Sequence, residues 1–188
     1  PWEFTDPLRA YATYGEALDI NWEKLEENKA LLKEYLKQAI AHYAQKGWLD
    51  RVYLFSIDEP DSPEAYNEVR AWSDFVRGIN PEVKVLLTEQ PLPDGPEHGS
   101  LVGYVDFWSM NMSVAVGVDT PFSPEELMKA LEERKNAGEE VSWYGALMLE
   151  PMPSLNLDRP GISARIIPWM SFKYGIDSFQ YWALDYWY

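Results

Sequence analysis

The sequence contains no cysteine and only two histidines, His42 and His98, among 188 residues. Without cysteine the chain has no disulfide framework, no thiol nucleophile and no thiolate metal ligand, and two distant histidines do not form a histidine-rich metal cluster. Long hydrophobic runs are also missing, since no stretch of about 18 apolar residues is present. We therefore expect a protein that uses no metal or other cofactor and does not insert into a membrane.

Basic residues are scarce as well. Sixteen Lys and Arg residues against 31 Asp and Glu residues give a net charge of -15, which repels nucleic acid and anionic membrane surfaces. Neutral ligands are the better expectation. Nine Trp and twelve Tyr residues would suit the flat apolar faces of sugars, but they suit a dense core equally well. The length and the 46% hydrophobic content predict one domain over 1–188, with an irregular lead-in over 1–20.

Hydrophobic periodicity predicts alternating strands and helices. The predicted helices cover 22–46, ended by Gly47, then 63–78, 123–136 behind a capping box, and 161–174 with a break at Pro168. The predicted strands cover 51–58, 83–89, 102–111, 141–148 and 178–184. These strands are too apolar to leave one face in water, so the pattern indicates an α/β fold with a parallel sheet buried by helices.

One apolar strand ends in the triplet Asp58-Glu59-Pro60. Alternation along the strand places Asp58 and Glu59 on opposite faces, and Pro60 should hold Glu59 in an extended conformation. Two neighbouring carboxylates should titrate as a coupled pair, which is one way to keep a general acid protonated. An acidic turn before the next helix would explain Asp61 and Glu64, but it does not explain an acid pair directly after an apolar strand.

Polar residues also follow the other predicted strands. They are Glu89-Gln90, Asn111, Glu150 and Asp185. The carboxyl ends of parallel strands are where α/β proteins form their sites, so a shared site is expected there. Asn111 and Asp185 could hold sugar hydroxyls, although either could instead bond to local backbone.

A longer series of segments resembles the catalytic region of glycoside hydrolase family 123 and its uncharacterised relatives. The resemblance rests on an ordered set of segments over roughly 22–187 and not on the triplet alone. The set comprises His42–Trp48, Arg51–Tyr53, Asp58–Pro60, Asn80–Lys84, Val105–Trp108, Trp143-Tyr144, Arg165, Pro168-Trp169, Lys173–Gly175, Tyr181–Ala183 and Trp187.

The resemblance implies a (β/α)8 TIM-barrel enzyme that removes terminal β-linked N-acetylgalactosamine with retention. The sugar's own 2-acetamido group would be the nucleophile, with Glu59 as general acid and base and Asp58 stabilising the acetamido group. Tyr144 would bond to the acetamido carbonyl, and Trp182 would form an apolar wall. The other candidate substrate-binding residues are Asn111, Asp185, Trp108 and Glu89.

Two features depart from the family pattern. A full barrel needs about 250 residues, so five predicted strands imply its C-terminal part, about strands 4 to 8. Ser178 stands where the family would have glycine. The resemblance further implies flanking β-sandwich domains and an extracellular or periplasmic location, while open sheet edges could lead to self-association.

Other functions fit the same residues. A non-catalytic carbohydrate-binding domain would keep the sheet and the aromatic residues without needing an acid pair. A purely structural half-barrel would need neither a ligand-binding surface nor an acid pair. A conventional two-carboxylate glycosidase with Glu59 as acid and Glu89 as nucleophile is the mechanistic alternative.

Overall fold

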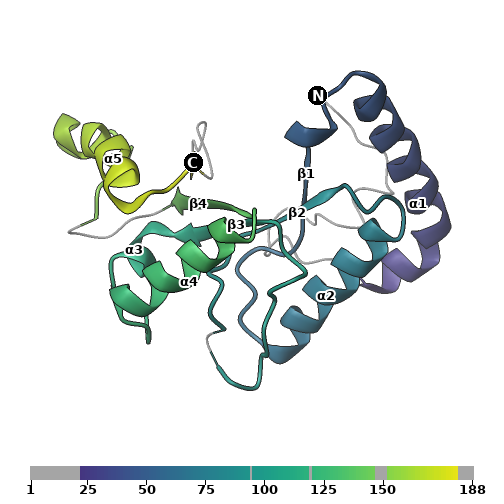
Figure 1. Ribbon diagram of the computed structural model, residues 1–188, viewed down its shortest axis with the longest axis horizontal. Coiled ribbons are helices and arrows are strands. Elements are labelled where there is room, and N and C mark those ends of the chain that lie inside the picture. The colour runs from purple at the N-terminus through teal and green to yellow at the C-terminus, as the bar shows by residue number, and fades with distance from the viewer. Residues whose placement is uncertain (1–21, 94, 119, 147–151, 182–188) are drawn as a thin grey trace. The chain divides into compact units, whose positions relative to one another are not determined.

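The computed structural model describes residues 22–93, 95–118, 120–146 and 152–181 (Figure 1). It divides into two compact units, each described by itself. The first contains the described part of Pro1–Leu87 together with Gly95–Asp106, and the second contains that of Thr88–Asp94 and Phe107–Tyr188.

Within each unit consecutive strands are separated by helices, and Figure 1 labels most of these elements. The first unit contains α1 (Trp22–Gln45), the 3-10 helix η1 (Leu49–Arg51), β1 (Tyr53–Phe55), α2 (Pro63–Arg77) and β2 (Lys84–Leu87). The second contains β3 (Phe107–Asn111), α3 (Met112–Ala115), α4 (Pro124–Asn136), β4 (Glu140–Gly145), α5 (Gly161–Tyr174) and β5 (Ser178–Tyr181).

The two strands of the first unit pair in parallel, and α2 begins where the sequence predicts. In the pairing Leu54 lies opposite Val85. The Ser62 hydroxyl accepts a hydrogen bond from the Ala65 amide at 3.2 Å, and Pro63 occupies the first helical turn. The buried face of α2 comprises Tyr66, Val69, Trp72, Ser73 and Val76.

The long helix α1 confirms the predicted amphipathic segment. Leu32, Leu36 and Ile40, spaced by four residues, form its buried row. Tyr35 and Tyr43 continue the hydrophobic spacing of three and four residues in the sequence, but both are exposed. Tyr35 lies to one side of the row and Tyr43 follows its last member, so the buried stripe is narrower and shorter than the sequence pattern predicts.

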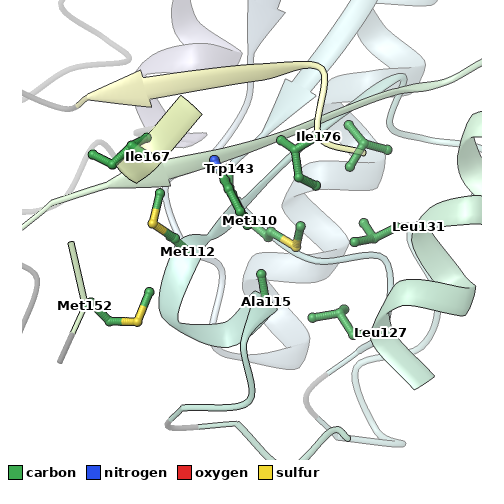
Figure 2. Packing of buried hydrophobic residues seen from close by; sticks show 10 residues of the cluster. Met110, Met112, Ala115, Leu127, Leu131, Trp143, Met152, Ile167 and Ile176 are labelled. Carbon is green, nitrogen blue, oxygen red and sulfur yellow. The ribbon is translucent and has the colours of Figure 1, made fainter. Parts of the chain in front are cut away.

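In the second unit, β3, β4 and β5 form a parallel array with β4 in the middle. One face of this array carries the hydrophobic core (Figure 2). Trp143 and Met110 from the strands lie among side chains of α3, α4 and α5 there. The described members of the cluster are Met110, Met112, Ala115, Leu127, Leu131, Val141, Trp143, Met152, Ile167 and Ile176.

Helix α4 shows the predicted capping box. The Ser123 hydroxyl accepts from the Glu126 amide at 3.2 Å, and the Glu126 carboxylate accepts from the Ser123 amide at 3.0 Å. Two hydrogen bonds from Ser123 lower the pKa of Glu126. The bond from the Ser123 backbone amide has the larger effect, and the bond from the Ser123 hydroxyl has the smaller one. The box is therefore intact at neutral pH and weakens as acid protonates this carboxylate.

Helix α5 runs unbroken through Pro168, contrary to the predicted break. Two hydrogen bonds at the Ser171 hydroxyl fix the turn that follows the proline. The Trp143 indole donates to the Ser171 hydroxyl at 3.0 Å, and that hydroxyl donates to the Ile167 carbonyl at 3.1 Å. Ile167 is also buried in the core cluster, so tertiary contacts offset the hydrogen bond that proline removes.

The strands are shorter than predicted. Of 51–58 only Tyr53–Phe55 is strand, and of 102–111 only Phe107–Asn111. The short helix α3 was not predicted. The α/β class and the parallel pairing are confirmed, whereas the eight-stranded barrel, its strand range and the single domain stay predictions. Within the described ranges no helix combines the length and hydrophobicity needed to span a membrane.

Candidate functional site

The acid pair lies in the loop that follows the carboxyl end of β1. Asp58 is half-buried and Glu59 is exposed. The residues that flank the pair, Ile57 before it and Pro60 after it, are both buried. The strand was predicted to reach Asp58, but β1 ends at Phe55, so the two carboxylates lie in a bend and are not placed by strand alternation.

The backbone of Glu59 has φ +44°, the only positive φ of a non-glycine residue in the described part of the chain. The sequence predicts an extended Glu59 because proline follows, and this prediction is wrong. The left-handed region costs an L-residue roughly 1–2 kcal/mol, and such strain persists only where the surroundings fix it. The backbone at Glu59 is thus fixed in a conformation that a glycine would adopt at lower cost.

This conformation gives a stability prediction. We expect Glu59→Gly to have a free energy of unfolding about 1 kcal/mol higher than Glu59→Ala, because glycine tolerates the positive φ. Urea denaturation of the two variants measures the difference. At Asp58, whose φ is not positive, glycine should instead be the less stable of the pair. Equal stability of the two Glu59 variants would show that the positive φ is not maintained in solution.

The second unit, taken by itself, has a row of polar side chains across its three strands. Asn111 lies opposite Tyr144, and Tyr144 lies opposite Gln180. Residues at alternate positions face the other way, and there Met110 and Trp143 belong to the hydrophobic core. The row therefore lies on the face of the array that the core does not use, near the carboxyl ends of β3, β4 and β5.

Hydrogen bonds fix the Asn111 end of this row. The Asn111 side-chain oxygen caps α3, accepting from the Ser113 amide at 3.0 Å and from the Ser113 hydroxyl at 2.6 Å. The amide nitrogen of Asn111 donates to the Tyr144 hydroxyl at 3.4 Å. Asn111 was predicted to hold sugar hydroxyls or local backbone, and the structure gives it the backbone role together with a contact to Tyr144.

Gln180 is the member of the row that the sequence prediction missed. Its side-chain oxygen accepts from the Ser109 hydroxyl at 3.1 Å, and the Ser109 and Ser142 hydroxyls lie 3.5 Å apart. A usable signal was present, because Ser178 and Gln180 alternate with Phe179 and Tyr181 in the manner of a strand with one polar face.

Two of the remaining predicted residues, Trp108 and Glu89, are buried. Trp108 is fully buried, and its indole donates to the Glu139 carboxylate at 2.6 Å. Glu89 is buried, and one of its oxygens accepts from the Gln90 amide at 2.9 Å. Trp182, Asp185 and Glu150 lie outside the described residues.

The chemistry offered by these residues is of two kinds. Asp58 and Glu59 supply carboxylates that can take up, release or stabilise charge, whereas the polar row supplies uncharged hydroxyl and carboxamide groups. No group of three His, Asp or Glu side chains suited to a metal ion occurs among the residues the structure describes.

Comparison with known proteins identifies a family. The model of the glycoside hydrolase 123 catalytic domain matches residues 1–188, which is the whole chain. A comparison with curated protein sequences finds no match. Because the family match spans every segment that carries the acid pair and the polar row, the chain belongs to the catalytic-domain family of glycoside hydrolase 123.

Proposed function

We propose that this glycoside hydrolase domain removes terminal β-linked N-acetylhexosamine, with N-acetylgalactosamine preferred, by a retaining, substrate-assisted mechanism. The observation that carries the proposal is the pair Asp58-Glu59 in the loop that follows a parallel strand in a chain of this family. Adjacent carboxylates suit a reaction in which the nucleophile belongs to the sugar, because a protein nucleophile would have to face the acid across the anomeric carbon at about 5 to 5.5 Å.

In the first step Glu59 donates its proton to the glycosidic oxygen as the bond from that oxygen to the anomeric carbon breaks. The carbonyl oxygen of the 2-acetamido group attacks the same carbon from the opposite face, forming an oxazolinium ion. Asp58 orients the acetamido N–H and stabilises the positive charge that develops on it. The leaving alcohol departs with the proton of Glu59.

In the second step the Glu59 carboxylate removes a proton from water while the water oxygen attacks the anomeric carbon. The bond from the acetamido oxygen to that carbon breaks, which restores the acetamido group and the β configuration. Glu59 is again protonated. Two inversions at one carbon give net retention.

The place of Tyr144 in the polar row, near the carboxyl end of β4, supports a role in holding the acetamido carbonyl. The hydrogen bond from Asn111 at 3.4 Å helps to position its hydroxyl, and a phenolic hydroxyl is a group that can donate to a carbonyl oxygen. Only 7% of Tyr144 is exposed, and burial strengthens such a hydrogen bond.

Calorimetric titration with N-acetylhexosamine thiazolines, which mimic the cyclised intermediate, tests the proposed function. We expect the galacto-configured thiazoline to bind more tightly than its gluco epimer, and both to bind far more tightly than the free sugars, since intermediate mimics exploit interactions made during the reaction. Release of sugar from aryl N-acetyl-β-galactosaminides measures turnover in parallel. A folded chain that neither binds the thiazolines nor releases the sugar would indicate the non-catalytic alternatives.

A further inference from the structure

Gln180 of β5 is bonded to a residue two strands away. Its side-chain oxygen accepts from Ser109 of β3, although β4 lies between these strands. Adjacent strands are about 4.8 Å apart, so the Gln180 side chain must lie across β4. The residue of β4 opposite Ser109 is Ser142, which is small and completely buried and leaves room for the carboxamide above it.

The bond to Ser109 also determines the direction of the Gln180 amino group. The oxygen and nitrogen of a carboxamide point in different directions from one carbon, so an oxygen that accepts from Ser109 turns Nε2 away from it. Ser109 and Ser142 lie one row nearer the amino ends of the strands than Asn111 and Tyr144. The Nε2 donors of Gln180 are therefore turned away from Ser109, and the residue opposite Gln180 on β4 is Tyr144.

The row nearest the carboxyl ends of the strands indicates what kind of ligand would bind. It contains Asn111, Tyr144 and Gln180. All three side chains are uncharged, and their carboxamide and hydroxyl groups form hydrogen bonds. Such a surface suits a neutral molecule with several hydroxyl or amide oxygens, as a sugar ring has.

We propose that Gln180 binds the substrate directly, with Nε2 donating a hydrogen bond to an oxygen of the sugar held beside Tyr144. Ser109 is then a positioning residue, since its hydroxyl fixes the orientation of the carboxamide. The choice of N-acetylhexosamine as the sugar rests on the proposed function, but the role of Gln180 as a donor to a neutral sugar does not.

Two variants distinguish the amino group of Gln180, which would donate to the sugar, from its side-chain oxygen, which accepts from Ser109. Gln180→Glu keeps an oxygen for Ser109 to bond and replaces the amino group with oxygen, and Gln180→Leu removes both groups. We expect each variant to weaken binding of the galacto-configured thiazoline about tenfold or more, as loss of a buried hydrogen bond to a ligand predicts. Ser109→Ala should weaken binding less, because the donor remains but is no longer fixed.

Ser178→Ala is the matched control, since Ser178 is an exposed hydroxyl on the same face of the same strand. It should bind the thiazoline as the unsubstituted chain does, and equal melting temperatures would show that all variants are folded. Binding that is unchanged in both Gln180 variants overturns this inference alone, while hydrolysis by the unsubstituted chain still supports the proposed function. Weaker binding by these variants in a chain that binds sugar without hydrolysing it supports the inference and contradicts the proposed function. A folded chain that binds no sugar overturns both.

Discussion

Replacing Glu59 by Gln is expected to lower kcat by roughly 10²–10⁴-fold on a substrate with an alkoxide leaving group, the usual contribution of a general acid and base. Gln keeps the size of the side chain but has no proton to give and no basic oxygen. An aryl glycoside whose leaving group departs without protonation should lose much less in the first step. Measuring kcat for a series of aryl N-acetyl-β-galactosaminides of increasing leaving-group basicity tests this dependence.

Azide provides a second readout for the same variant. Azide needs no general base, so with an aryl glycoside whose first step is still fast it should restore turnover in Glu59→Gln and give a β-configured glycosyl azide. Glu64→Gln is the matched control, because Glu64 is an exposed carboxylate in the first turn of α2; it should retain the unsubstituted rate. If Glu59→Gln cleaves the alkyl glycoside at that rate, Glu59 is not the acid.

The bounds of the four longer helices, α1, α2, α4 and α5, could be predicted closely because their signals are local. Ser62 with Pro63 and Ser123 with Glu126 determine where α2 and α4 begin, and all four act within one turn. The end of a strand depends on its partner, so the strand predicted over 51–58 was too long. The course of α5 through Pro168 depends equally on distant residues, because an indole from β4 bonds to the turn that follows it.

The candidate site likewise has features that local sequence predicts and features that depend on distant residues. The sequence alone predicts the placement of the acid pair after a strand, but it predicts the wrong backbone conformation for Glu59 because no local rule favours a positive φ before proline. Asn111 was recognised as a polar strand end. Its actual partners are Ser113 and Tyr144, and only the spacing to Ser113, typical of a helix cap, could be read from the sequence. The hydrogen bond between Gln180 and Ser109 depends on the register of β3, β4 and β5. The sequence alone does not specify that register.

Replacing Asp58 by Asn is expected to lower kcat by roughly 10²–10³-fold, the usual cost of removing one group that stabilises charge in a transition state. Asn preserves shape but cannot balance the positive charge of the oxazolinium ion. The effect should depend on the acetamido group of the substrate. Measuring kcat with N-acetyl, N-fluoroacetyl and N-difluoroacetyl substrates tests this, because fluorine makes the carbonyl oxygen a poorer nucleophile and should slow the unsubstituted chain progressively.

Two further variants identify the mechanism. Asp61→Asn removes an exposed carboxylate from the same loop and should leave kcat unchanged, which separates the role of Asp58 from the general negative charge of the loop. Glu89→Gln should also retain turnover if the sugar supplies the nucleophile, whereas a conventional two-carboxylate mechanism would lose nearly all of it. Rates that ignore fluorine substitution, combined with an inactive Glu89→Gln, would assign the nucleophile to Glu89. The opposite combination assigns it to the substrate, because only then does the reaction depend on the basicity of an oxygen that the protein does not contain.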